Sequence, residues 1–104
     1  KKKNIQLIRS KVNKKGKFDI KAILKKLYKY NCRNLLIEGG DSLTSHLLKN
    51  KIFNKFYLYK SPKNLSKKTE YLKFNSLDVL KKNYKNKFNL KLFLGKDKIT
   101  LYKN

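Results

Sequence analysis

Two stretches in the first half of the chain place their apolar residues on one side of a helix. In the first, Asp19 can cap a helix of about three turns, and the apolar stripe follows directly. That stripe is formed by Ile20, Ile23, Leu24, Leu27 and Tyr28. In the second, over residues 42–50, Asp41 and Ser42 stand at cap positions. Its apolar side is formed by Leu43, Leu47 and Leu48. The pattern therefore predicts two amphipathic helices.

Three short apolar segments alternate with these helices and are predicted to be strands. They cover residues 4–9, 35–37 and 53–59. The middle segment, Leu35-Leu36-Ile37, is too uniformly apolar for a surface element and indicates an interior parallel strand. The third is rich in aromatic residues and ends at Ser61-Pro62. The order strand, helix, strand, helix, strand predicts right-handed crossovers and a parallel three-stranded core with helices against it.

The remainder of the chain predicts a loop, a short helix and a hairpin. Residues 63–73 are polar and lack periodicity, so we expect a surface loop, and Ser76 can cap the helix that follows. Residues 90–94 and 99–101 alternate in polarity on either side of a turn at Gly95, which predicts an antiparallel hairpin at the edge of the sheet. Because the chain has no repeat and no Gly/Ser/Pro linker, we expect its 104 residues to form one domain.

The most informative stretch lies between the predicted middle strand and the second helix. Over residues 34–43 an apolar run stops at Glu38-Gly39-Gly40 before a new amphipathic segment begins. Glycines let a ligand approach the backbone closely, and the first amides of a helix have no partner within it, so together they can bind a phosphate or pyrophosphate. The alternative is an ordinary strand-to-helix turn capped by Asp41 or Ser42.

The charge of the chain raises the question of nucleic acid. The formal net charge is +23, from 29 Lys+Arg against 6 Asp+Glu, and such a surface attracts polyanions. The lysines, however, are scattered through every segment, and arginine occurs only at Arg9 and Arg33. Joint enrichment of lysine and asparagine is what an AT-rich coding sequence yields. We therefore favour compositional drift over a nucleic-acid-binding module, which stays as the alternative function.

The cysteine count and the hydropathy indicate the cellular environment of the protein. Cys32 is the single cysteine, so the chain predicts neither an internal disulfide nor a thiolate metal cluster, and we expect a small core thiol in a reducing cytoplasm. No apolar segment approaches the ~20 residues needed to cross a bilayer, so we expect a soluble protein.

Few residues can carry catalysis. The single histidine, His46, falls in the second helix and is either a surface residue or a neighbour of a bound phosphate. Glu38, directly after the apolar run, either binds a ligand or accepts hydrogen bonds from the turn amides, and we favour the first. There are no paired carboxylates, no His/Cys cluster and no defensible Ser-His-Asp set. If the protein is an enzyme, its chemistry belongs to a bound cofactor.

Taken in order, several motifs resemble the C-terminal part of a known domain family. They are Phe18-Asp19-Ile20, Asn34-Leu35-Leu36-Ile37-Glu38-Gly39-Gly40, Leu47-Leu48, Phe56-Tyr57-Leu58-Tyr59 with Ser61-Pro62, and Leu94-Gly95-Lys96-Asp97. This set is similar to the riboflavin-biosynthesis reductase domain, which is related in fold to dihydrofolate reductase. The resemblance implies an α/β three-layer sandwich with a mixed, mostly parallel sheet, helices on both faces and a C-terminal antiparallel hairpin.

The resemblance also implies a reaction and a site. In this family NADPH delivers hydride to the ribose C1′ of 5-amino-6-(5-phosphoribosylamino)uracil, and no side chain acts as a covalent catalyst. Glu38 would contact the substrate near the nicotinamide. The residues after Glu38 would bind the cofactor's pyrophosphate, and the resemblance supports this role less for the last two of them. These residues are Gly39, Gly40, Asp41, Ser42, Leu43, Thr44, Ser45 and His46. The negative charge of Asp41 must then point away from the pyrophosphate or be neutralised.

The match covers only part of such a domain, so we expect residues 1–104 to be its C-terminal portion. Methionine is absent even at position 1, which indicates a piece of a longer protein. In bacteria the reductase commonly follows a zinc-dependent deaminase domain in one bifunctional protein, and the zinc ligands would lie in that absent domain. Family members are homodimers. We expect the chain alone to be inactive or nearly so.

Overall fold

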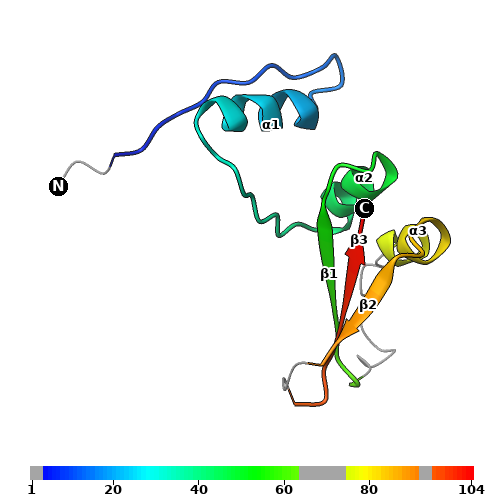
Figure 1. The fold of residues 1–104 in the computed structure, drawn as a ribbon. Helices are drawn as coiled ribbons and strands as arrows, with labels where there is room; N and C mark the ends of the chain where they lie inside the picture. The colour runs from blue at the N-terminus through cyan, green and yellow to red at the C-terminus, as the bar shows by residue number, and fades with distance from the viewer. Residues whose placement is uncertain (1–3, 64–74, 92–94) are drawn as a thin grey trace. The chain divides into compact units, whose positions relative to one another are not determined.

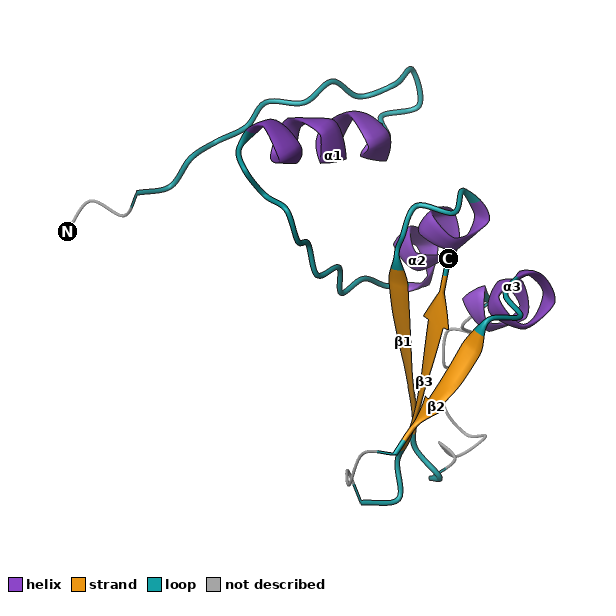
Figure 2. Cartoon of the chain, viewed as in Figure 1, coloured by secondary structure: helices purple, strands orange, loops and turns teal. Residues whose placement is uncertain are grey.

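The computed structural model describes residues 4–63, 75–91 and 95–104. It is a mixed α/β structure with three helices and a small antiparallel sheet of three strands among these residues (Figures 1 and 2). The chain divides into two compact units, Lys1–Ile37 and Glu38–Asn104. The division falls immediately before the carboxylate and two glycines that the sequence singles out.

The first unit is organised by helix α1, Ile20–Lys29. Its N-cap is Asp19, whose carboxylate accepts a hydrogen bond from the Ala22 amide at 3.1 Å, as predicted. Before the helix, Val12 and Phe18 form an isolated antiparallel bridge around a turn at Gly16, where φ is +68°. None of the helix residues is buried, so the apolar stripe of α1 is correctly predicted but only partly covered within its own unit.

The predicted strands over residues 4–9 and 35–37 are wrong for this structure. Both segments are without regular structure, and their apolar side chains are exposed, Leu7 by 90% and Leu36 by 79%. A strand forms only where a second backbone segment pairs with it, and no neighbouring strand meets either segment among the described residues. The parallel core that rested on these segments is therefore wrong as well.

The sheet lies in the second unit and is entirely antiparallel. Its strands are β1, Lys55–Lys60, β2, Lys87–Leu90, and β3, Lys98–Lys103, in the order β1-β3-β2. The predicted C-terminal hairpin is confirmed as the β2–β3 pair, although β2 begins earlier than expected and residues 92–94 lie outside the described residues. β3 occupies the centre of the sheet instead of its edge, because β1 pairs with its other side.

Two helices of this unit pack against one face of the sheet. They are α2, Asp41–Lys49, and α3, Ser76–Asn83. One core cluster is formed by Leu48, Leu80, Tyr84 and Tyr102, and its partly buried neighbours include Phe56 and Leu58 of β1. Leu47, Ile99 and Leu101 are also buried. The hydroxyl of Tyr84 donates to the carbonyl oxygen of Leu48 at 2.6 Å, which ties the end of α3 to α2.

The other face of the sheet lacks a helix of this unit. Tyr57, Tyr59 and Phe88 alternate onto that face and stay exposed. Within residues 38–63, 75–91 and 95–104 the expected helices on both faces are therefore not present, and the unit has two layers. The predicted surface loop over residues 63–73 lies, except for Lys63, outside the described residues. In the described part of the chain no helix is long and apolar enough to cross a membrane.

Candidate functional site

The two glycines before α2 are exposed and serve different purposes. Gly40 is the N-cap of α2 with φ −68° and ψ 176°, an extended conformation that any residue adopts. A Cβ atom added to Gly40 would meet nothing within 4 Å, so the surface in front of the helix is open. A Cβ added to Gly39 would lie 2.9 Å from Cδ2 of Leu43, so the side chain of Leu43 occupies the space that a larger residue would need.

The start of α2 presents backbone donors to this open surface. The amide of Thr44 donates to the Gly40 carbonyl at 3.1 Å and its hydroxyl to the Gly39 carbonyl at 3.3 Å. The amides of Asp41, Ser42 and Leu43 precede this first helical bond, and amides in that position have no acceptor within their helix. Together with the positive end of the helix dipole they attract an anion. Ser42 is exposed beside them.

Asp41 has a structural role that the sequence did not reveal. Its carboxylate accepts hydrogen bonds from the Ser76 hydroxyl at 2.6 Å and the Ser76 amide at 2.9 Å, and the Asn75 side chain donates to it at 3.4 Å. The hydroxyl bond from Ser76, followed by the amide bond, holds the pKa of Asp41 below its ordinary value of 3.8. The carboxylate is thus held by residues at the start of α3 and stays ionised, so its charge is not neutralised.

The capping predictions for these two helices are wrong. Gly40, which has no side chain, is the N-cap of α2 in place of Asp41 or Ser42. Asn75 is the N-cap of α3 in place of Ser76, and it makes no capping bond of its own. Ser76 is completely buried and Asp41 supplies the missing acceptor from the neighbouring helix. Sequence spacing cannot reveal such a cap, because donor and acceptor belong to different helices.

The remaining predicted site residues are less closely grouped. Ser45 and His46 lie in the second turn of α2, where their amides follow the first helical bond, and His46 is exposed. Its carbonyl oxygen accepts from the side chain of Asn50 at 2.8 Å. Glu38 is exposed and lines neither of the two hollows described in this molecule. The geometry therefore brings together residues 39–44, and the roles of Glu38, Ser45 and His46 stay predictions.

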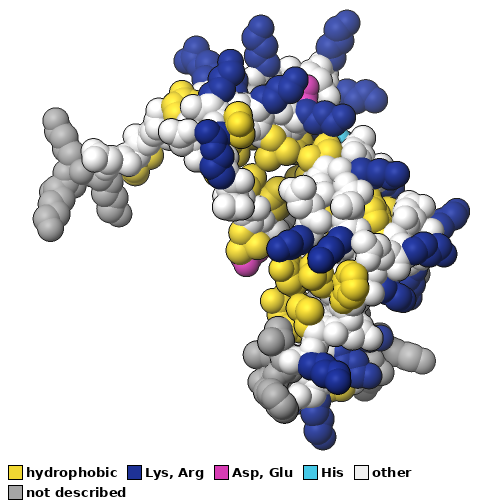
Figure 3. Space-filling view, in the orientation of Figure 1, with side chains coloured by type: hydrophobic (Ala, Val, Ile, Leu, Met, Phe, Trp, Pro, Cys, Tyr) yellow, Lys and Arg dark blue, Asp and Glu magenta, His cyan; other side chains and the backbone are white. Residues whose placement is uncertain are grey.

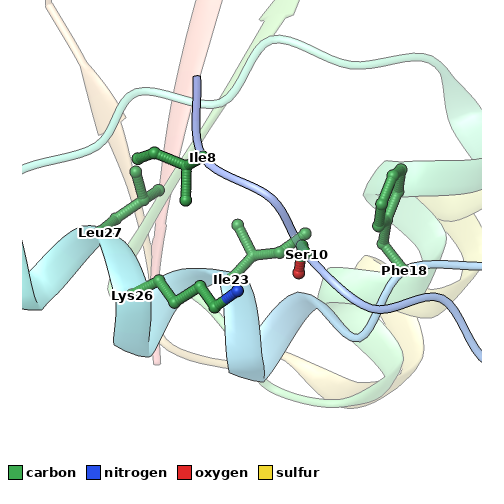
Figure 4. A pocket seen from close by; sticks show the side chains of 6 residues that line it. All are labelled: Ile8, Ser10, Phe18, Ile23, Lys26 and Leu27. Carbon is green, nitrogen blue, oxygen red and sulfur yellow. The ribbon is translucent and has the colours of Figure 1, made fainter. Parts of the chain in front are cut away.

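A separate hollow of about 290 Å³ lies in the first unit, between α1 and the segment before it (Figure 4). It is lined by Ile8, Ser10, Phe18, Ile23, Lys26 and Leu27. The ammonium group of Lys26 donates to the carbonyl oxygen of Arg9 beside it. The signal in the sequence for this hollow is the apolar stripe of α1 together with the apolar Ile8. Its lining offers neither a carboxylate nor an imidazole, and its one ionisable group is this Lys26 ammonium.

On the face drawn in Figure 3, the basic side chains do not single out a nucleic-acid interface. Figure 3 shows lysine and arginine side chains spread across the visible face, over α1 and over the sheet unit alike.

The described residues bring no group of three His, Cys, Asp or Glu side chains close enough to hold a metal ion. Cys32 donates its thiol to the Asn34 carbonyl at 3.5 Å.

The described fold defines a class: a mixed α/β protein with three helices and a small antiparallel sheet of three strands. The chain belongs to the RibD C-terminal domain family, whose model matches residues 1–91. This confirms the resemblance to the riboflavin-biosynthesis reductase domain, and the family implies a dihydrofolate-reductase-like fold and an NAD(P)H cofactor.

A curated relative supports the same family. The riboflavin biosynthesis protein RibD of Buchnera aphidicola subsp. Baizongia pistaciae (strain Bp) is 45% identical to this chain over 51 residues. The matched stretch is 49% of this chain and 14% of the relative. The match therefore covers a small part of that relative's length. A search of solved structures gave no match.

Proposed function

We propose that the chain is the C-terminal portion of a reductase domain that uses NADPH to reduce 5-amino-6-(5-phosphoribosylamino)uracil in riboflavin biosynthesis. The observation that carries this proposal is the exposed start of α2. Its first three amides have no acceptor within the helix, and the two residues before it, Gly39 and Gly40, have no side chains to cover them. Membership of the RibD C-terminal domain family supplies the reaction.

The residues present fit the pyrophosphate of a dinucleotide. The amides of Asp41, Ser42 and Leu43 can donate to phosphate oxygens, and the exposed hydroxyl of Ser42 adds a further donor. The space in front of Gly40 admits the oxygens without a Cβ clash. The Asp41 carboxylate accepts its hydrogen bonds from Ser76, so it does not use the α2 amides as donors, but it stays ionised and its charge works against the anion. When bound, NADPH supplies hydride for the ribose C1′ of the substrate.

Glu38 is proposed to orient the substrate beside the nicotinamide. It directly precedes the glycines and is exposed, so its carboxylate can accept hydrogen bonds from a ligand. Binding and orientation of two reactants are what this reaction asks of the protein, since hydride transfer needs the donor and acceptor carbons in contact. Ser45 and His46 would extend the contacts along α2.

The exposed apolar residues of the first unit support the view that the rest of the domain is needed. Leu7 and Leu36 are largely exposed, although their segments have the pattern of buried strands. In the parent protein, further strands of the same domain would pair with these segments and cover them. We propose a cytoplasmic homodimer in which a zinc-dependent deaminase domain accompanies the reductase. The chain alone should then bind the cofactor and leave the substrate unreduced.

The test is an amide-resolved NMR titration of the 104-residue chain with NADPH. We expect the amide signals of Asp41, Ser42 and Leu43 to shift and those of β2 to stay unchanged. Gly40→Val should weaken this binding at least tenfold, while the matched Gly40→Ala, which adds only a Cβ to open space, should weaken it less. Because the backbone at Gly40 is extended, both variants should fold. Absence of shifts at Asp41, Ser42 and Leu43 in the unaltered chain would contradict the proposal.

A further inference from the structure

We propose that the end of the sheet at Lys60 and Lys98 is a second anion site, which binds a small phosphate-bearing ligand of about the size of inorganic diphosphate. It is separate from the start of α2 and does not depend on the proposed reductase function. A hollow of about 270 Å³ opens at this end of the sheet. It is lined by Lys60, Ser61, Pro62, Lys96 and Lys98.

The register of β1 and β3 brings two of these ammonium groups to one place. Lys60 and Lys98 are direct cross-strand partners, so their side chains leave the same face of the sheet. Along that face the pairs Phe56–Tyr102 and Leu58–Thr100 precede them. The row therefore changes from apolar to cationic where it reaches the hollow. Like charges directly opposite each other repel, and an anion held between them removes that repulsion.

The other groups around the hollow also suit an anion. The turn that leads into β3 brings Lys96 to the lining, after Gly95 with φ +63°. The Ser61 hydroxyl accepts from the Lys63 amide at 3.3 Å and keeps its own proton for donation. Asp97 stands between two of the lysines in sequence but does not line the hollow. No carboxylate among the described residues thus competes for the three ammonium groups at the lining.

The size of the hollow favours a compact anion over a polymer. Its lining is confined to five residues at one end of the sheet, and three of them are lysines. The several oxygens of inorganic diphosphate can meet all three, since lysine binds phosphate as a point charge. A nucleic-acid strand would instead contact lysines over the whole surface.

The second lysine pair of the sheet provides a matched control. Lys55 and Lys103 are also direct cross-strand partners, at the opposite end of the same two strands, and they line neither hollow. By the alternation of side chains they leave the other face, where the ammonium group of Lys103 lies 5.2 Å from the ring centre of Phe88. Removing either pair lowers the net charge by the same amount.

The experiment titrates the 104-residue chain with inorganic diphosphate and follows amide shifts. We expect shifts at Lys60, Ser61, Lys96 and Lys98, and a loss of affinity of at least tenfold in Lys60→Gln/Lys98→Gln. The control Lys55→Gln/Lys103→Gln should lose less than threefold. An equal loss of affinity in both double variants would show that diphosphate binds through net charge alone, and it would overturn the site. Amide shifts spread over all lysine-bearing segments would do the same. So would the absence of local shifts in the unaltered chain, whatever the variants do.

A final arm separates this site from the α2 site and from nucleic acid. The Lys60→Gln/Lys98→Gln variant should still show the NADPH-induced shifts at Asp41, Ser42 and Leu43 if the proposed function is right. In the unaltered chain, absence of the NADPH-induced shifts at these three amides with diphosphate binding intact would end the proposed function alone. Tighter binding of a single-stranded RNA than of diphosphate, with shifts beyond the hollow, would overturn the assignment of a compact ligand.

Discussion

The carboxylate of Asp41 and the buried Ser76 join the first residues of two helices. Ser76 donates both its hydroxyl, at 2.6 Å, and its amide, at 2.9 Å, to Asp41, although 35 residues separate them. The contact satisfies a donor at the start of α3 and holds the negative charge of Asp41 there. The same contact therefore joins α2 to α3 at their first residues.

Removal of the Ser76 hydroxyl should destabilise the sheet unit. In Ser76→Ala the bond to the Asp41 carboxylate is lost at a position with no solvent access, so we expect a loss of about 1 kcal/mol in the free energy of unfolding. Chemical denaturation monitored by circular dichroism measures this loss. Ser42→Ala, at an exposed position of α2, serves as the control and should change the free energy by less than about 0.5 kcal/mol.

The pH dependence of stability should carry the signature of Asp41. Its pKa is lower in the folded chain than in the unfolded one, because Ser76 donates to the charged form. The stabilisation is therefore fully present above the unfolded pKa and is lost as the pH falls through the folded pKa. Denaturation midpoints measured from about pH 6 down to about pH 2 should fall in this acid range. In Asp41→Asn the decrease should be smaller, and an unchanged acid profile would contradict the contact.

Two predicted elements, helix α1 and the C-terminal hairpin, were confirmed for the same physical reason. Helix α1 with its Asp19 cap and the β2–β3 hairpin are specified by residues close in sequence, through a cap three residues from its donor and a turn between alternating strands. The predictions of strands over residues 4–9 and 35–37 failed because an apolar pattern indicates burial, whereas a strand also needs a partner segment, which the local sequence does not specify.

The candidate site was predictable to a similar extent. The Glu38-Gly39-Gly40 turn and the helix after it could be located, because glycine pairs and helix starts are local signals. The partner of Asp41 could not, since nothing in the spacing connects residue 41 with Ser76 across two helices. The hollow beside Lys60 and Lys98 was also missed, because it depends on the register of β1 against β3.

The buried hydroxyl of Tyr84 should be measurable in the alkaline range. Burial raises the pKa of Tyr84, so the folded state holds its proton more tightly than the unfolded state. This contribution is present below the unfolded pKa and is lost as the pH rises through the folded pKa. Tyr84→Phe should flatten the alkaline decrease in stability, and at neutral pH it should cost about 1 kcal/mol through the lost bond to Leu48. Exposed Tyr59→Phe is the control and should leave both unchanged.

The core of the sheet unit should be sensitive to a single cavity. Leu80 has no solvent access and packs with Leu48, Tyr84 and Tyr102, so Leu80→Ala should cost about 2–5 kcal/mol. In a unit with so few buried residues this loss should abolish the cooperative unfolding transition. Leu7→Ala removes the same atoms from a side chain that is 90% exposed and should cost less than about 0.5 kcal/mol. Equal effects of the two substitutions would refute the assigned core.

The two glycines before α2 should respond differently to the same substitution. At Gly40 the backbone is extended and an added Cβ meets only open space. Gly40→Ala should therefore change the free energy of unfolding by less than about 0.5 kcal/mol, because the lower entropy of the unfolded chain offsets the poorer N-cap residue. At Gly39 the added Cβ would lie 2.9 Å from Cδ2 of Leu43, and that side chain must turn away from its position on α2. Gly39→Ala should therefore be less stable than Gly40→Ala in urea denaturation, with shifted methyl signals of Leu43. If Gly39→Ala equals or exceeds Gly40→Ala in stability and leaves those signals in place, the packing of Leu43 against the turn is refuted, and with it the steric requirement for glycine at position 39.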